Sequence, residues 1–425
     1  MTISCLAGAF NTGTGAVSST IDVTGSITIS GASAVILFTS GRTEATDTVG
    51  RATRYRAVGF AVSSSDRRSQ MSVSGDALGA ADGGSYHTDA AALVSCDLAG
   101  AIDGALDFDS WLSNGFRLIV DDVMPRDYRV GYLIITGLDN AATGQWQDQA
   151  ATGNFAVTTG LSFQPTCEIM FASVINTAPP SSRGISSVLG FGFAVSTTER
   201  ATWCGGTDEG SPSMDTDSYC LDLECLSSMP STLGTSVDDR LDFVSHNSNG
   251  FTLNQLEVPG SISYNHFLAL RGGSYAVRSV TTQTDTTTDI TTSVLGFDPA
   301  GVLAISAFKA EHAQNVPNVH DTGSFGAASG TGARVAMAWR DEDGVADSIV
   351  STAVEHDEIY ASITATAIEG LMDVKTFADP LVFIMDDADP SAKFVTMLVV
   401  GNALAAKTRP MLIARPDVPV RALRI

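Results

Sequence analysis

The sequence lacks the short motifs that mark common catalytic and metal-binding sites. It contains no Cys-x-x-Cys pair and no set of His and Cys residues with the spacing of a zinc site. It also has no Gly-x-Ser-x-Gly elbow, no His-Glu-x-x-His pair and no Walker phosphate loop. We therefore expect a protein that is not an enzyme and holds no cofactor. A catalytic triad or a carboxylate pair assembled by the fold stays an alternative.

Long apolar runs are also absent. No stretch approaches the length of a membrane span, and the first residues lack the charged start and apolar run of a signal peptide. We therefore expect no membrane partner and a chain made in the cytoplasm of its host. The six cysteines do not recur with any fixed spacing, so we expect them reduced and buried, while a bridge from Cys204 to Cys220 or Cys225 stays open.

Lysine is scarce, with four residues in 425, and 47 acidic against 24 basic residues give a net charge of −23. A field of this sign repels phosphate backbones, which argues against a nucleic-acid partner. The exception is residues 407–425, where five basic residues accompany one acid and three prolines prevent a helix. The basic residues are Lys407, Arg409, Arg415, Arg421 and Arg424. We interpret this segment as an extended assembly arm that lies on an acidic neighbour, the alternative being a tail folded back on its own domain.

The chain is rich in short apolar stretches that repeat. An apolar strand ending in an aromatic residue lies at 34–38 and 168–171, with a looser copy at 302–308. A Gly-Phe-Ala-Val stretch at 59–62 returns at 192–195, and we place its loose third copy at 335–342. A third landmark, Leu106–Phe108, returns as Leu241–Phe243 and Met372–Val374. The chain is therefore expected to contain three related units.

We place the units at 1–140, 153–273 and 274–406, followed by the arm at 407–425. Residues 139–153 are expected to be a polar linker, and the short second boundary predicts tight packing of units two and three. Residues 26–30 alternate as a strand does, and Asn249-Gly250 indicates a hairpin. Residues 349–360 fit either a helix or a strand. The prediction is an all-β protein of three tandem antiparallel β-sandwiches, jelly-roll-like, with an extended C-terminal arm.

The repeat resembles one found in virion structural proteins of tailed bacteriophages. The resemblance rests on GFGFA at 190–194, NGFTLN at 249–254 and FLALRGG at 267–273. It covers unit two well and unit one fairly, whereas unit three departs from it at most positions. It implies a virion location in the tail, a fibre or the capsid surface, where a decoration protein is the alternative, with no catalytic residues to carry over. The implied partners are other virion proteins and copies of the chain, as a homo-oligomer such as a trimer.

Two sets of residues are candidates for binding. The acidic turns Asp121-Asp122 and Asp386-Asp387 have the oxygen ligands that Ca²⁺ prefers, although Asp is also a common turn residue. Trp111, Trp203 and Tyr219 are predicted beside loops, where exposed aromatics would form a ligand face for a host surface glycan; packing in the core is the other interpretation. Residues 311–330, with His312 and His320, are expected to form a surface loop.

Overall fold

The fold is built from β-strands. The computed structural model describes residues 2–404 except 44–46, 52, 77–81, 159, 184–185, 209–214, 231–236, 312–317 and 346–348. These described residues contain no helix, and therefore no helix that could cross a membrane. The expected all-β class is confirmed.

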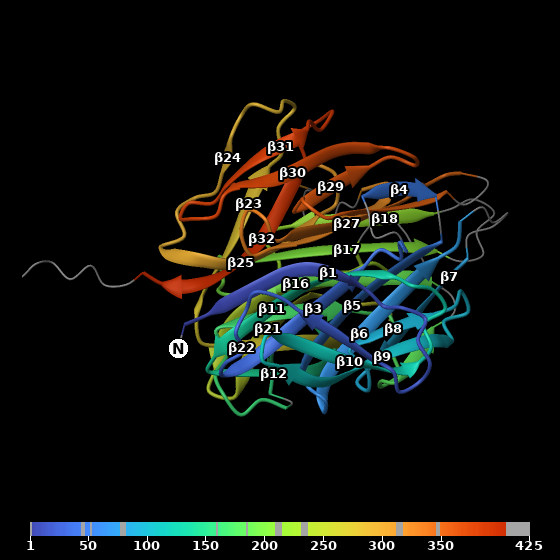
Figure 1. Ribbon diagram of the computed structural model, residues 1–425. Helices are drawn as coiled ribbons and strands as arrows, with labels where there is room; N and C mark the ends of the chain where they lie inside the picture. Colours follow the sequence, from blue (N-terminus) through green and yellow to red (C-terminus); the bar gives the residue numbers. More distant parts are fainter. Residues whose placement is uncertain are drawn as a thin grey trace, which may run out of the picture.

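Three units follow one another along the chain, and each has a large and a small antiparallel sheet (Figure 1). In unit one the large sheet runs β1 (Ser4–Asn11), β11 (Arg129–Leu138), β3 (Ala32–Thr39), β5 (Arg54–Ser63), β6 (Asp66–Ser74), β7 (Gly83–Thr88). Its small sheet runs β2 (Thr20–Thr24), β10 (Gly115–Asp122), β9 (Ile102–Leu112), β8 (Leu93–Cys96).

The other two units repeat this order. The large sheet of unit two runs β12 (Asn140–Gln147), β22 (Tyr264–Arg271), β14 (Cys167–Ala172), β16 (Ser186–Ala194), β17 (Arg200–Asp208), β18 (Thr216–Leu221). Its small sheet runs β13 (Gly153–Val157), β21 (Gly250–Glu257), β20 (Asp239–Asn247), β19 (Leu226–Ser228). The large sheet of unit three runs β23 (Ser274–Thr281), β32 (Phe394–Ala403), β25 (Phe297–Ser306), β26 (Asp321–Ala328), β27 (Arg334–Asp341), β28 (Val350–Glu355). Its small sheet runs β24 (Ile290–Thr291), β31 (Val382–Asp387), β30 (Ile368–Thr376), β29 (Tyr360–Ile363).

The jelly-roll-like expectation fits the outer strands of each unit. The first strand pairs with the last, and the second pairs with the last but one, as β1 with β11 and β2 with β10 show. The strands between them form simple meanders, such as β5–β6–β7 and β8–β9–β10. Each unit is therefore a β-sandwich with a jelly-roll-like closure and meandering inner strands.

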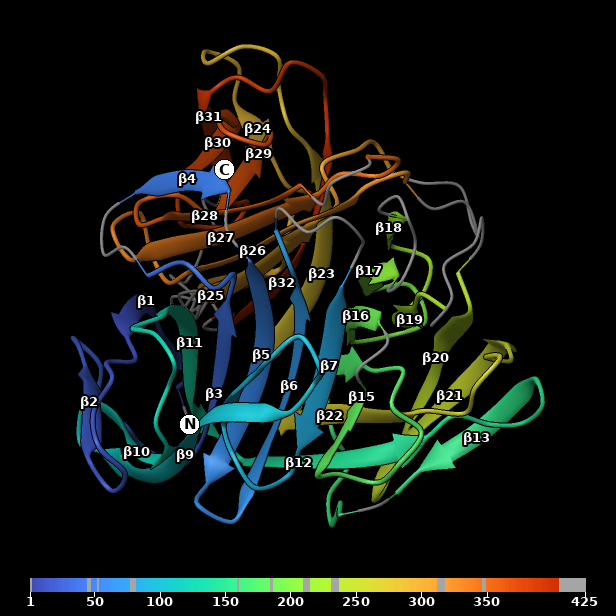
Figure 2. The ribbon, with the colours of Figure 1, turned by 90° about the vertical axis from the view of Figure 1, so that its right-hand side faces the viewer.

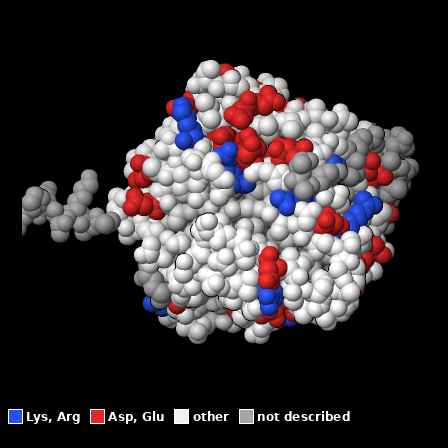
Figure 3. Space-filling model, viewed as in Figure 1, with Lys and Arg blue, Asp and Glu red and all other residues white. Residues whose placement is uncertain are grey.

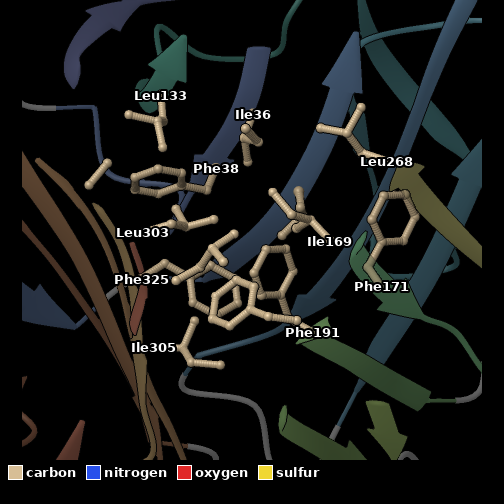
Figure 4. Packing of buried hydrophobic residues seen from close by; sticks show 14 of the residues in the cluster. Ile36, Phe38, Leu133, Ile169, Phe171, Phe191, Leu268, Leu303, Ile305 and Phe325 are labelled. Carbon is tan, nitrogen blue, oxygen red and sulfur yellow. The ribbon is translucent and has the colours of Figure 1, made fainter. Parts of the chain in front are cut away.

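The three large sheets pack against one another around a shared core, so the array is closed and not linear. In β3 the side chains of Val35 and Leu37 enter the core of unit one, while those of Ile36 and Phe38 enter the shared core. Burial on both faces explains why such strands are continuous apolar runs. The shared core combines residues of all three units (Figure 4): Ile36, Phe38, Leu133, Ile169, Phe171, Phe191, Leu268, Leu303, Ile305 and Phe325.

At the end of the molecule that faces the viewer in Figure 2, a short segment of each unit crosses to the preceding unit, and that of unit one crosses to unit three. In unit one β4 (Thr48–Arg51) pairs with β28 of unit three. In unit two β15 (Ser181–Arg183) pairs with β7 of unit one. In unit three Asn318 forms an isolated bridge with Ser218 of β18 in unit two. The exchange is cyclic, as in a ring of three subunits with pseudo-threefold symmetry.

The opposite end of the molecule holds the junctions between units. A single residue, Asp139, separates β11 from β12, and Gly272-Gly273 separates β22 from β23. The third junction closes without a peptide bond, because Asn402 accepts a hydrogen bond from the Ile3 amide (2.6 Å) and donates one to its carbonyl (2.8 Å). The ring is therefore closed where the two described ends of the chain meet.

A glycine at one position of the repeat lets the two sheets of each unit approach closely. A Cβ on Gly59, Gly192 or Gly326 would lie within 2.0 Å of a backbone oxygen of the small-sheet side. The oxygens belong to Ala92, Cys225 and Ile359. Gly326 therefore identifies β26 as the third copy of the Gly-Phe-Ala-Val landmark, and the placement of that copy at 335–342 was wrong; those residues overlap β27, the following strand.

Three further expectations were wrong. The described part of the expected surface loop at 311–330 contains β26, which is buried along its whole length. The expected linker at 139–153 contains β12, which pairs with β22 and opens unit two at Asn140. Residues 26–30 form no strand, although Ile27 is buried. The Asn249-Gly250 hairpin is confirmed, and 349–360 contains strand β28 and the first residue of β29.

Candidate functional site

One ion pair occurs at the same place in every unit and ties the large sheet to the small one. The pairs are Arg67–Asp107, Arg200–Asp242 and Arg334–Asp373, the last at 2.9 Å. Arg200 and Arg334 are the first residues of β17 and β27, and Arg67 is the second residue of the equivalent strand β6. Each aspartate lies in the Leu/Met-Asp-Phe/Val landmark. All six side chains are largely shielded from solvent. The ion pair therefore explains why an aspartate recurs in the Leu/Met-Asp-Phe/Val landmark.

Replacing Arg200 with alanine should lower the free energy of unfolding by about 1 kcal/mol, because the pair is only partly shielded and Asp242 keeps its bond from the Phe243 amide. Urea unfolding of the Arg200→Ala chain measures this loss. The same change at Arg67 should have a similar effect because the pair is equivalent. A loss below 0.3 kcal/mol at both positions would argue against a role in holding the sheets together.

A buried ionic cluster lies where the three large sheets meet. The side chains of Arg54, Arg56, Asp321 and Asp341 are all buried. Arg54 Nη1 contacts both Asp321 Oδ2 and Asp341 Oδ2 at 2.7 Å, and its Nη2 donates to Ser187 Oγ at 2.7 Å. Arg56 Nη1 donates to both oxygens of Asp321 at 2.9 Å. Two arginines from unit one therefore balance two aspartates from unit three.

The cluster is completed by aromatic and hydroxyl side chains. The Arg56 guanidinium lies over Trp203 (5.0 Å) and Trp339 (5.6 Å), in positions for cation–π attraction. Burial, followed by the positive charge of the neighbouring Arg54, lowers the pKa of Arg56 to about 10, although the two aspartates oppose the shift. Burial likewise raises the pKa of Asp341 to about 6, opposed by Arg54. All four charged side chains of the cluster are buried, and their contacts join unit one to unit three.

The three seams between units repeat one contact. The chain that follows β5, β16 or β26 contacts the first strand of the next unit, and unit three contacts unit one in this way. Asp66 accepts hydrogen bonds from Thr143 (2.9 Å from its amide), Glu199 pairs with Arg278 (2.7 Å), and Ser329 accepts one from the Ala7 amide (2.9 Å).

The seam between units two and three also contains a cavity of about 330 Å³. Its lining is polar except for one valine: Thr198, Glu199, Arg200, Asp222, Val277, Arg278, Ser279 and Ser293. Ser279 Oγ donates to Asp222 Oδ2 at 2.8 Å across the seam. This cavity is the best candidate binding site among the described residues, and sequence reasoning did not find it, because its walls come from segments far apart in the chain.

A histidine pair joins units one and two. His87 Nε2 lies 3.0 Å from the Thr177 carbonyl, and its Nδ1 lies 3.1 Å from His266 Nε2. Burial lowers the pKa of His87 to about 4 and holds the pKa of His266 well below its usual value, where His87 adds to the effect. Both rings are therefore neutral at physiological pH, and the pair is a structural contact.

The predicted acidic turns are equivalent to each other but do not assemble a site. Asp121 and Asp386 are the extra residues of a β-bulge that recurs in β10 and β31, and Asp122 and Asp387 follow them, all exposed. Among the described residues no group of three or more His, Cys, Asp or Glu side chains is placed to hold a metal ion. The recurrence of these acids is explained by an exposed bulge at a strand end.

The predicted ligand face is wrong for two of its three residues. Trp203 and Tyr219 are fully buried, Trp203 beneath Arg56 and against Trp339 (5.1 Å between rings). Trp203 of β17 faces the core shared by the three units, whereas Tyr219 of β18 packs in a cluster within unit two that includes Val188 and Met229. Trp111 is half-buried, packs on Phe108 and donates to the Val62 carbonyl at 2.8 Å. The interpretation as core packing fits Trp203 and Tyr219.

The assembly arm, Lys407, Arg409, Arg415, Arg421 and Arg424, lies outside the described residues, as does His312. All six cysteines are free, and five of them are buried; Cys5 is partly exposed. No family model matches the chain, and no curated protein matches it in sequence.

Proposed function

We propose that this chain is a non-enzymatic structural component of a tailed-phage virion, in the tail, a fibre or the capsid surface. It acts through contacts with copies of itself and with other virion proteins. The observation that carries the proposal is the closed ring of three sandwiches, with a common core and cyclic strand exchange. Such a body is a rigid building block, and its interior is occupied by packed side chains and a sealed ionic cluster.

The ring also bears on the expected oligomer. One chain supplies the threefold arrangement that a trimer of single units would otherwise form. The proposed homo-oligomer is therefore an association of whole rings, made through their outer surfaces. Acidic side chains gather over the small sheet of unit three on the face shown in Figure 3. An acidic outer surface suits contacts with basic segments of a neighbour.

The alternative of a glycan-binding module is less favoured, because Trp203 and Tyr219 are buried and leave Trp111 alone of the three aromatics near the surface. Stacking on a sugar ring needs an exposed aromatic face.

The test of the proposed function is the position of the chain in purified particles. We expect it in the particle by mass spectrometry, with a defined copy number from cryo-electron microscopy. Few copies would place it in the tail or a fibre, and hundreds would place it on the capsid as a decoration protein. Its absence from particles, combined with abundance in the infected-cell lysate, would contradict the proposal.

A further inference from the structure

The cavity between units two and three corresponds to a place that is filled at the seam between units one and two. There Arg68 of β6 reaches across the seam and contacts Gln145 (2.8 Å) and Asp89 (3.2 Å). Strand pairing identifies the equivalent residues, because Arg68 faces Phe60 as Ala201 faces Phe193. In the same way Ser279 takes the place of Gln145, and Asp222 follows β18 as Asp89 follows β7. The guanidinium of seam one–two is thus replaced by a methyl group at seam two–three.

The carboxylate that would receive this guanidinium is retained. Asp222 lines the cavity and is bound by the Ser279 hydroxyl. Glu311 lies close to it: burial, and then a hydrogen bond and repulsion from Asp222, raise the pKa of Glu311 to about 7. A cation entering here would relieve the repulsion between the two carboxyls.

The arginines that line the cavity already have partners. Arg200 pairs with Asp242 and donates to the Leu223 carbonyl (3.0 Å), and Arg278 pairs with Glu199 and donates to the Val294 carbonyl (3.2 Å). The side chains of Leu223 and Val294 are 55% and 67% exposed, which places an unusual amount of aliphatic surface beside a charged cavity.

We propose that this cavity binds an arginine side chain from residues 405–425 of a second copy of the chain, with neighbouring apolar residues of that arm covering Leu223 and Val294. The proposal rests on the proposed function as an assembling structural protein. The arm matches the site in charge, because it carries five basic residues and one acid while the rest of the chain has a net charge of −27. It also matches in character, since four of its basic residues are arginines and Met411, Leu412 and Ile413 lie among them.

Guanidinium recognition is favoured over a general attraction of charges. A bidentate guanidinium–carboxylate contact is directional and stronger than a point-charge contact. The equivalent seam uses an arginine for the same purpose within one chain. One copy therefore provides in trans the group that its own unit two has lost.

The experiment measures self-association of the full chain by sedimentation velocity over a range of concentrations. We expect concentration-dependent association that Asp222→Asn weakens about tenfold or more, whereas the matched change Asp89→Asn at the filled seam leaves it unchanged. Changing Arg409, Arg415, Arg421 and Arg424 together to lysine keeps the charge and should weaken association by a similar factor. Thermal melts of each variant show whether the fold is retained.

A second variant fills the cavity from within. Ala201→Arg copies the arrangement of Arg68, and it should abolish association, while Ala151→Arg in an exposed loop of unit two adds the same charge without effect. A chain that stays monomeric, or one that Asp222→Asn and Asp89→Asn affect equally, overturns the inference. If the chain is found in particles while Asp222→Asn leaves its self-association unchanged, the inference fails and the proposed function stands.

Discussion

Replacing Arg54 with methionine is expected to lower the free energy of unfolding by about 3–5 kcal/mol, measured by urea or thermal unfolding. Arg54 bridges Asp321 and Asp341 with one guanidinium nitrogen, and all three side chains are fully buried. Its loss leaves two carboxylates in the shared core with only Arg56 to balance them. Breaking a buried pair costs much more than the pair contributes, because the remaining charge keeps its desolvation penalty.

The double variant Arg54→Met, Asp321→Asn is the matched control. It removes one surplus carboxylate, while the amide of asparagine can still accept a bond from Arg56. We expect it to recover at least 1 kcal/mol of the loss, because charges in one network are not additive. If the double variant were less stable than Arg54→Met by the full cost of Asp321→Asn alone, the two residues would not be coupled as the geometry indicates.

The same cluster explains why the units are joined in one chain and in one order. Arg54, Ser187 and Asp321 occupy one position of the repeat and meet where the three sheets converge. Three identical units would place three arginines or three aspartates together there, which is strongly unfavourable. The differences between units are therefore required by the ring, and the divergence of unit three supplies the acids that unit one needs.

The repeat and the all-β class could be predicted from the sequence because they rest on local patterns. Landmarks such as Leu106–Phe108 and Leu241–Phe243 lie on equivalent strands, and the Asn249-Gly250 turn forms its hairpin. The ring could not be predicted, since its contacts join residues 267 positions apart, such as Arg54 and Asp321. One signal was available. Arg54 and Arg56 lie on the same face of their strand as the apolar Val58 and Phe60, and a charge on such a face needs a buried partner.

The misassigned segment of unit three shows a different limit. Residues 311–330 are rich in glycine and small polar residues, which favours a loop in isolation. In the ring, Asp321–Ala328 of this segment form β26, where Gly326 accommodates the Ile359 carbonyl and Gly323 accommodates Trp339. Composition suited to close packing between sheets is hard to distinguish from composition suited to a turn, because both require small side chains.

Stability should fall as the pH rises from 6 to 9, which is opposite to the usual behaviour of paired carboxylates. Glu355 and Glu358 are 2% and 3% exposed. Burial, followed by repulsion from neighbouring aspartates, raises the pKa of Glu355 to about 8 and that of Glu358 to about 9. Glu358 Oε2 has no hydrogen-bond partner among the described residues. Both groups are therefore protonated in the folded protein at neutral pH and ionised in the unfolded chain.

The sign follows from proton binding. Above pH 5 the unfolded chain has released these protons while the folded chain holds them, so a rise in pH favours unfolding until the folded groups ionise. Each group contributes up to about 1.4 kcal/mol per pH unit over this interval. As the pH falls from about 6.5 to 4, the histidine pair acts in the opposite direction. The pKa of His87 is lowered from 6.5 to about 4 in the folded protein, so the unfolded chain takes up this proton first and unfolding is favoured.

Glu358→Gln isolates the largest of these contributions. The amide cannot ionise, so we expect the variant to be more stable than the parent at pH 8–9. The slope of its unfolding free energy against pH should correspond to about one bound proton fewer than in the parent. Calorimetric or chemical unfolding at pH 5, 6, 7, 8 and 9 measures both quantities. Asp298→Asn, which removes an exposed carboxylate, should shift the curve little and leave its slope unchanged. If the pH dependence of stability of Glu358→Gln ran parallel to that of the parent, Glu358 would be ionised in the folded protein. Its negative charge beside Asp373, Asp386 and Asp357 would then be balanced by a group other than a bound proton.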